Sequence, residues 1–222
     1  MESEKRLVVL DMDSTFIQQE VIDLLAKYSG VAAEVAEITE RSMRGELDFR
    51  SSLAARVSLL KGLPVTFLDA VRDEISLSIG AQRMVDVLQD LGHTVAVVSG
   101  GFESVIAPIL RAANVNYFKA NSLEVAEGAL TGRTVGEIID RPAKALYLQE
   151  LAAQFHIPLA QTVAVGDGAN DLGMMEIAGL SIAFNAKPIV VKAARAAIVD
   201  GDLTGVLRLM GIPDEDIERY PL

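Results

Sequence analysis

The chain has 222 residues, half of them hydrophobic, and carries a formal net charge of −11. That length suits one domain, or a core domain with a smaller inserted one, and it allows a sizeable buried core. A surface this acidic repels nucleic acid and anionic membranes, and no stripe of lysine and arginine reverses the repulsion locally. We therefore expect neither as a partner, while the oligomeric state stays open.

Cysteine is absent, which excludes disulfides and thiolate metal sites and fits a reducing cytosol. The apolar run at residues 7–10 is too short for the core of a signal peptide or for a membrane span. A longer apolar stretch at residues 189–199 is interrupted by Lys192 and Arg195. We expect a soluble, cytoplasmic protein.

The first predicted element is a buried strand at residues 7–10, which ends at Asp11. No strand pattern occurs from 17 to 79, and we predict helices there at 17–29, 32–44, 49–60 and 65–75. Asp48 is a favourable N-cap for the third helix, and Pro64 stands where the fourth should begin. This stretch predicts a helical cap domain, residues 17–79, inserted into a core formed by residues 1–16 and 80–222. A cap there would cover the site and exclude water.

After the predicted cap, helices and strands alternate. We expect helices at 81–91, 102–114, 143–155 and 171–178, strands at 94–98, 162–165 and 180–184, and a hairpin at 123–134 that turns at Glu127 and Gly128. The alternation predicts an α/β fold, a Rossmann-like doubly wound parallel sheet with helices on both sides. Ligands of such sheets bind beyond the carboxyl ends of the strands, where the polar clusters of this sequence lie.

Two carboxylates, Asp11 and Asp13, follow the first strand directly. They would repel each other unless a nearby charge offsets them, and a hard cation such as magnesium, which prefers oxygen ligands, does this well. A turn or helix-capping role is an equally common reason for an Asp-x-Asp pair. The pair alone therefore leaves both interpretations open.

The other strand ends carry groups that suit an anion and a cation. Ser99-Gly100-Gly101 offers backbone N–H groups at a strand-to-helix turn, although such turns often contain Ser and Gly for backbone reasons alone. Lys144 stands near a helix start, where a cation is unfavourable unless an anion is close; the alternative is an ordinary surface lysine. The run from Gly166 to Asp171 adds two more carboxylates and an amide.

Together and in this order, the four motifs resemble the haloacid dehalogenase superfamily, and within it the phosphoserine phosphatases. The closer resemblance is carried by Asp11-Met12-Asp13-Ser14-Thr15, Glu20, Arg56-Val57-Ser58-Leu59-Leu60, Val97 to Phe102, Leu130-Thr131-Gly132 and Val163 to Asp171. It runs from about residue 7 to residue 210. The acidic tail from 211 to 222 has no counterpart, and we expect a surface segment there. We expect no regulatory domain before the first strand, and therefore no feedback control through one.

The resemblance implies a mechanism for the first motif and the metal. Asp11 would attack phosphorus and form an aspartyl-phosphate, and Asp13 would act as general acid and then as general base. Mg²⁺ would be held by the Asp11 side chain, the Asp13 backbone carbonyl and Asp167. Asp171 would orient the metal site through a water or a hydrogen bond.

The resemblance also implies which residues bind the substrate. Ser99, the Gly100 N–H and Lys144 would hold the phosphoryl oxygens, and Asn170 would reach the substrate side of the site. The implied activity is hydrolysis of O-phospho-L-serine to L-serine and phosphate, the last step of serine biosynthesis.

Two predicted cap residues, Glu20 and Arg56, would select this substrate. A glutamate that faces a phosphate site is unfavourable unless the substrate brings a cation, and an arginine beside it can clamp a carboxylate. Ammonium plus carboxylate means an amino acid, and in the resembling family these positions bind the serine amine and carboxylate. Phe49 and Met43 match positions that enclose the substrate. Surface roles for the charged pair and helix packing for the other two are the alternatives.

Two other functions fit part of the pattern. A phosphotransferase that passes the phosphoryl group to an alcohol, or a phosphatase for another small phosphorylated amino acid such as phosphohomoserine, would use the same residues. A signalling receiver domain is also doubly wound and phosphorylated on aspartate, but it lacks a helical insertion after its first strand and places its acceptor later in the sheet.

Overall fold

The computed structural model describes residues 4–43 and 46–221 and contains one seven-stranded sheet in the order β4-β3-β2-β1-β5-β6-β7. The strands are β1 (Leu7–Leu10), β2 (Thr94–Phe102), β3 (Tyr117–Ala126), β4 (Ala129–Val135), β5 (Thr162–Gly166), β6 (Leu180–Phe184) and β7 (Ala196–Ile198). All neighbours pair in parallel except β3 and β4, which pair antiparallel. The predicted doubly wound α/β fold is confirmed.

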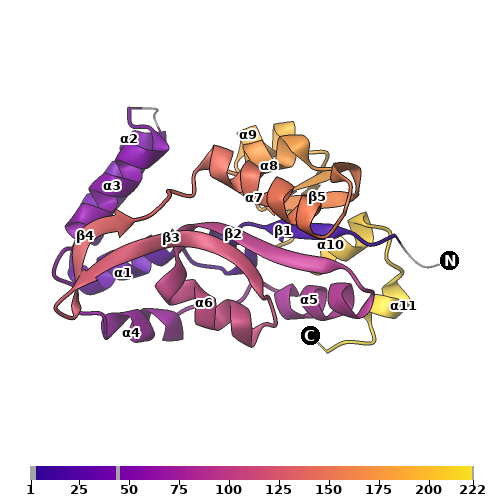
Figure 1. Ribbon diagram of the computed structural model, residues 1–222, viewed down its shortest axis with the longest axis horizontal. Coiled ribbons are helices and arrows are strands. Elements are labelled where there is room, and N and C mark those ends of the chain that lie inside the picture. The colour runs from indigo at the N-terminus through magenta and orange to yellow at the C-terminus, as the bar shows by residue number, and fades with distance from the viewer. Residues whose placement is uncertain (1–3, 44–45, 222) are drawn as a thin grey trace.

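Helices cover both faces of this sheet (Figure 1). In β1, Val8 and Leu10 pack into the hydrophobic cluster on one face, whereas Leu7 and Val9 pack into the cluster on the other. The first cluster includes residues of α5 (Ala81–Asp90), α6 (Glu103–Ala112) and α10 (Thr204–Leu209), and the second includes residues of α7 (Arg141–Gln154), α8 (Leu172–Ile177) and α9 (Pro188–Ala193). Burial on both faces explains why the central strands are continuous apolar runs rather than alternating ones.

The four predicted strands are all present, but β2 is longer than expected. It runs on through the Ser-Gly-Gly segment to Phe102, with a shift of register against β3 after Val98. The predicted hairpin joins β3 to β4, and its turn residues Glu127 and Gly128 have φ values of 51° and 78°. The prediction missed β7 and the first half of β3.

Four helices form an insertion between β1 and β2. They are α1 (Val21–Ser29), α2 (Ala32–Met43), α3 (Phe49–Leu59) and α4 (Phe67–Asp73). Asp48 is the N-cap of α3, as predicted, and accepts a hydrogen bond from the Ser51 N–H at 2.9 Å. The predicted end of the second helix at Arg44 lies outside the described residues.

Two helix starts within this insertion were predicted wrongly. Residue 17 does not begin a helix, because Ile17 forms a β-bridge with Leu77 and so closes the base of the insertion. Pro64 does not begin the regular part of α4, because its backbone bridges to Ala129 in the hairpin. In both cases a long-range backbone contact overrides the local helix signal.

The C-terminal segment is more than the predicted surface tail. It forms α11 (Asp214–Ile217), in which Ile217 is only 1% exposed, and it packs against α5. The Arg83 Nε donates to the Pro221 carbonyl at 2.9 Å, and Tyr220 pairs with Asp90.

Across the described residues, no helix is both long enough and apolar enough to cross a membrane.

A buried asparagine joins three segments at the carboxyl ends of the strands. Asn121 lies within β3 and is fully buried. Its Nδ2 donates to the Gly100 carbonyl, and its Oδ1 accepts from the Ile139 N–H, both at 2.8 Å. Asparagine is unfavourable inside strands, so its position here reflects the two backbone groups that it satisfies.

Replacement of Asn121 by alanine should therefore lower the free energy of unfolding by about 1–3 kcal/mol, because it leaves the Gly100 carbonyl and the Ile139 N–H without their hydrogen-bond partner. The measurement is urea unfolding of the variant and of Asn116→Ala as a control, whose exposed side chain should change stability by less than about 0.5 kcal/mol. Equal effects of the two substitutions would contradict a bridging role for Asn121.

Candidate active site

Three neighbouring strands meet where the sequence predicted a site. Leu10 of β1 lies beside Val97 of β2 on one side and Val165 of β5 on the other, so the residues that follow these three positions are neighbours. The Asp11 N–H continues the ladder by donating to the Val165 carbonyl at 2.9 Å. Because the three strands run parallel, Asp11 lies between the Ser-Gly-Gly segment of β2 and Asp167.

A buried lysine holds two of the carboxylates together. The Lys144 Nζ donates to Asp11 Oδ1 at 2.6 Å and to Asp171 Oδ1 at 2.7 Å. Lys144 and Asp171 are fully buried, and Asp11 is 4% exposed. The alternative of a surface lysine is wrong. Lys144 lies in the first turn of α7, and the anions that the helix dipole argument called for are Asp11 and Asp171.

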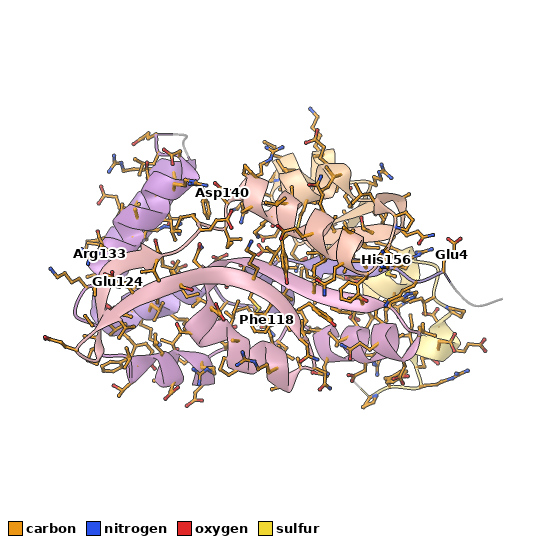
Figure 2. All side chains as sticks on the ribbon, in the orientation of Figure 1. Glu4, Phe118, Glu124, Arg133, Asp140 and His156 are labelled. Atoms are coloured by element: carbon orange, nitrogen blue, oxygen red, sulfur yellow. The ribbon has the colours of Figure 1, made fainter. Side chains whose placement is uncertain are left out.

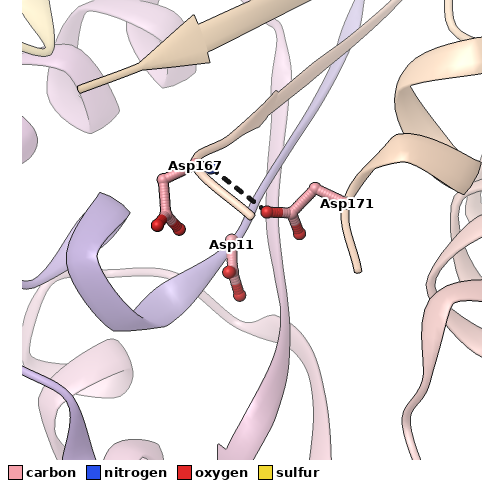
Figure 3. Close-up of side chains that lie close together, drawn as sticks. All are labelled: Asp11, Asp167 and Asp171. Carbon is pink, nitrogen blue, oxygen red and sulfur yellow. Dashed lines mark hydrogen bonds between the residues drawn. The ribbon is translucent and has the colours of Figure 1, made fainter. Parts of the chain in front are cut away.

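Asp171 also holds the loop that carries Asp167. Its Oδ2 accepts hydrogen bonds from the backbone N–H groups of Asp167 at 3.1 Å and Gly168 at 3.0 Å, and Figure 3 shows the first of these. Gly166 has no Cβ, and one placed there would lie 2.4 Å from Asp171 Cγ. The loop therefore needs glycine at 166 for Asp171 to reach both Lys144 and the backbone.

The charges of this cluster do not balance. Carboxylate oxygens of Asp11, Asp167 and Asp171 all lie within 4.8 Å of one another (Figure 3). Burial and the nearby carboxylates of Asp171 and Glu20 raise the pKa of Asp167 to about 6. Burial and Asp171 also raise the pKa of Asp11, against the opposing effect of Lys144.

A hard divalent cation fits this donor set. If Asp11, Asp167, Asp171 and Lys144 are all ionised, the three carboxylates and one ammonium leave an excess of two negative charges. Oxygen ligands and a double positive charge are what Mg²⁺ combines. The metal ligands predicted from the resemblance differ from this carboxylate cluster in one ligand, the backbone carbonyl of Asp13. That ligand stays a prediction. The structure instead places the carboxylate of Asp171 in the cluster.

Asp13 faces the Ser-Gly-Gly segment. A Cβ at Gly101 would lie 3.0 Å from both Asp13 Oδ2 and Ser99 Oγ, and the Ser99 Oγ accepts from the Gly101 N–H at 2.8 Å. Among the described residues, Asp13 Oδ1 is one of a few buried side-chain atoms without a hydrogen-bond partner. Burial and the carboxylate of Glu20 raise the pKa of Asp13 well above its ordinary value. An unpartnered buried oxygen indicates a place where a ligand atom belongs.

The insertion contributes Glu20 and Arg56 to the same region. The Ser14 hydroxyl donates to Glu20 Oε1 at 2.8 Å, and Ser14 itself has the left-handed φ of 56°. Arg56 is half-buried, and its charge interacts with those of Glu20 and Asp13. Burial lowers the pKa of Arg56, while these carboxylates act in the opposite direction. The charges of Glu20 and Arg56 thus act on the same region as that of Asp13.

The remaining predicted residues lie around this centre. The Phe49 ring packs over Gly100, 3.2 Å from the position that a Cβ would take there. The Asn170 amide oxygen lies against Gly168, where a Cβ would come within 2.3 Å of it. The side chain of Met43 lies outside the described residues.

Sequence reasoning did not single out several residues that support this site. Asn121 binds the Gly100 carbonyl, Asp140 caps the helix that carries Lys144, and Arg50 pairs with Asp140. A local signal existed for two of them: Asn121 is an asparagine inside a strand, and Asp140 stands one residue before an Arg-Pro pair that starts a helix. The contact of Arg50 depends on tertiary structure alone.

Comparison with known proteins places the chain in a family. Residues 8–176 match the family model of haloacid dehalogenase-like hydrolases. The chain therefore belongs to the haloacid dehalogenase-like hydrolase family, a class that the doubly wound sheet and the aspartates after its first strand already indicated.

Several similar proteins carry the name phosphoserine phosphatase. The chain is 51% identical to "Phosphoserine phosphatase" of Streptomyces coelicolor over 96% of its own length and 52% of that protein. It is 48% identical to "Phosphoserine phosphatase" of Streptococcus thermophilus over 95% of its length and 98% of that protein. The chain thus spans about half of the first relative and nearly all of the second.

Solved structures agree with the sequence comparison. A substrate-bound phosphoserine phosphatase complex has a TM-score of 0.89 and 42% identity, with 94% of this chain and 99% of that chain covered. A phospho-aspartyl intermediate analogue of phosphoserine phosphatase has a TM-score of 0.88 and 42% identity over 93% and 99% of the two chains.

Proposed function

We propose that the protein hydrolyses O-phospho-L-serine to L-serine and phosphate, the last step of serine biosynthesis, through an aspartyl-phosphate on Asp11. The observation that carries the proposal is the buried cluster of Asp11, Lys144 and Asp171 beside Asp13, whose Oδ1 has no partner among the described residues. The names of the relatives and a solved phospho-aspartyl intermediate analogue support it.

Asp11 would be the nucleophile. Its Oδ1 is held by the Met12 N–H at 2.7 Å and by Lys144 at 2.6 Å, which fixes the orientation of the carboxylate before the substrate arrives. Lys144 also offsets negative charge beside the reacting phosphorus, because the carboxylates of Asp11 and Asp171 hold the pKa of Lys144 above its ordinary value even though burial alone would lower it. Such preorganised charge is the main source of stabilisation in phosphoryl transfer.

Asp13 would move the proton. Its pKa is raised by burial and by Glu20, so a proton is available for the serine oxygen as the P–O bond breaks. The same carboxylate, once deprotonated, would accept a proton from the water that hydrolyses the aspartyl-phosphate. Ser99, the Gly100 N–H and Lys144 would bind the phosphoryl oxygens, and Asn170 the substrate side.

The donor set supports Mg²⁺ as the cofactor. Asp11, Asp167 and the backbone carbonyl of Asp13 would hold the ion, with Asp171 beside them, and the bound ion would offset charge on the transferring phosphoryl group. Asp171 has a second task, because it ties Lys144 to the loop that carries Asp167. Loss of Asp171 would therefore disturb the lysine and the metal loop together.

The helical insertion would act as a cap domain that selects the substrate. Glu20 would bind the ammonium group of phosphoserine, and Arg56 its carboxylate. Phe49, which packs over Gly100, would close the space between Glu20 and Arg56. The division into a cap of residues 17–79 and a core of residues 1–16 and 80–222 stays a prediction, and the bridge from Ile17 to Leu77 at its base supports it.

The alternative functions differ in how the structure bears on them. The receiver-domain hypothesis is wrong, since the chain belongs to a different family and carries the helical insertion of α1 to α4 after its first strand. Transfer to an alcohol, or hydrolysis of phosphohomoserine, would use the same residues, so only a comparison of substrates and acceptors distinguishes it from the proposal. The cytoplasmic location stays a prediction.

Asp11→Asn should reduce phosphate release from phosphoserine to below about 1% of wild type, since the amide is not a competent nucleophile and its loss raises the barrier by several kcal/mol. The assay measures phosphate release, with a melting curve to verify the fold. More than that residual activity in a folded variant would exclude covalent catalysis through Asp11.

Mg²⁺ at about 100 times its Kd should stabilise the wild-type protein by about 2.7 kcal/mol, because it offsets the repulsion among the buried carboxylates. Asp167→Asn should show a smaller shift in melting temperature.

Chelation should stop phosphate release, and Ca²⁺ should not restore it, since calcium takes longer bonds and more ligands. Full activity in excess chelator would remove the metal from the mechanism.

Arg56→Ala should cost about 2–5 kcal/mol of transition-state stabilisation for phosphoserine, measured as a fall in kcat/KM. It should leave kcat/KM for an aryl phosphate nearly unchanged, because only phosphoserine has a carboxylate. Arg41→Ala is a matched control, since Arg41 also lies in the insertion but pairs with Glu46 at its surface. Equal losses on both esters would mean that Arg56 supports packing or binds phosphate instead.

A further inference from the structure

The helical insertion is fixed to the sheet at one end by α4. Arg72 of α4 donates from Nη2 to the Ser104 carbonyl at 3.2 Å and from Nε to the Val105 carbonyl at 3.3 Å. Pro108 lies inside α6 and has no N–H, so the Ser104 carbonyl lacks its usual helical donor. Arg72 therefore donates a hydrogen bond to the Ser104 carbonyl, which Pro108 leaves without a donor inside α6.

The segment between α3 and α4 is fixed by backbone bonds to the hairpin of β3 and β4. The Gly62 N–H donates to the Leu130 carbonyl at 2.8 Å, and the Leu130 N–H donates to the Leu63 carbonyl at 2.9 Å. The Val65 N–H donates to the Gly128 carbonyl at 3.0 Å. The carboxyl end of α3 and the start of α4 are therefore anchored through main-chain groups.

The opposite end of α3 meets the site through side chains. Phe49, its first residue, packs over Gly100, and the next residue, Arg50, pairs with Asp140 through Nε and Oδ2 at 2.7 Å. Figure 2 labels Asp140 between α3 and α7, where the chain from β4 enters α7. The Arg50 side chain is 62% exposed, whereas that of Asp140 is 13% exposed. This end of α3 thus has the weaker attachment.

Asp140 connects this contact to the site. Its Oδ1 accepts from the Ala143 N–H at 3.1 Å and so caps α7, whose first turn carries Lys144. The neighbouring Ile139 N–H is bound by Asn121, which also binds the Gly100 carbonyl. The first turn of α3 therefore rests on two points, Gly100 and Asp140, that a single buried amide ties together.

We propose that Arg50 and Asp140 are positioning residues, which hold the first turn of α3 against the site and so place the insertion over Asp11 during the reaction. The proposal rests on the proposed function, in which the insertion closes over the substrate. The contact can break in every turnover, because an ion pair with one exposed partner changes the equilibrium between the attached and detached states by a factor of about five at most. Arg72 and the hairpin bonds keep the far end of the insertion attached meanwhile.

Two substitutions separate this role from general stability. Asp140→Asn removes the charge but keeps an N-cap residue for α7, because asparagine caps helices as well as aspartate does. Arg50→Gln removes the cation and leaves α7 untouched. Each should lower kcat/KM for phosphoserine about two- to fivefold. The double variant should be no worse than either single one, because both remove the same interaction.

Hydrogen exchange tests the position of α3 without any substrate. In both variants the amides of α3 should exchange about two- to fivefold faster, while those of α4, which Arg72 anchors, should not change. Arg208→Gln is the control, since Arg208 is an arginine of similar exposure whose ion pair, with Asp214, lies on the opposite side of the protein from the insertion. That control should change neither exchange in α3 nor kcat/KM.

The outcomes are distinct. Unchanged exchange in α3, or independent losses that multiply in the double variant, would overturn the role of the pair. A wild-type protein that does not hydrolyse phosphoserine would instead overturn the proposed function, and exchange in α3 would still decide whether Arg50 and Asp140 hold this end of the insertion.

Discussion

The ammonium group of Lys144, buried between the carboxylates of Asp11 and Asp171, is the interaction on which the rest of the site depends. A buried ion pair that loses one partner is destabilised by about 3–5 kcal/mol, so the surrounding fold must keep all three groups in place. It does so from separate elements: α7 presents the lysine, β1 ends at Asp11, and the loop after β5 folds back so that Asp171 reaches Lys144. Glycine at 166 makes that last step sterically possible.

The site is divided between groups on the sheet and groups on the insertion. Asp11 and Asp167 directly follow strands and Ser99 lies within one, so the same backbone ladders that build the core fix their positions. Glu20 and Arg56 belong to the insertion, whose place over the sheet depends on longer-range contacts. The groups proposed for the reaction chemistry are thus held by the ladders of the sheet, and those proposed for substrate selection by the contacts of the insertion. This arrangement suits an enzyme that must admit a substrate and then surround it.

Prediction from the sequence succeeded where the signal is local. The central strands are continuous apolar runs, because the sheet is covered on both faces, and Glu127 and Gly128 have the residue types of a tight turn. It failed where a distant partner decides. Ile17 has the pattern of a helix residue but pairs with Leu77, and Pro64 has the pattern of a helix start but bridges to the hairpin. The edge strand β7 has only three residues, Ala-Ala-Ile, one half-buried, one exposed and one buried, which is too short for a recognisable strand pattern.

The sequence by itself determined the fold class, the order of its elements and the residues that converge on the site, because strand periodicity and the polar ends of parallel strands are local properties that topology brings to one edge. Only the tertiary structure decided the state of those residues. The sequence indicates an anion near Lys144 but not which one, and only the packing of α7 places the lysine between Asp11 and Asp171. The resemblance gives Asp171 an orienting role at the metal, and only the structure shows that its oxygens reach both Lys144 and the Asp167 N–H. The physical reason is that burial, charge balance and hydrogen bonding depend on neighbours from other parts of the chain, which no local pattern specifies.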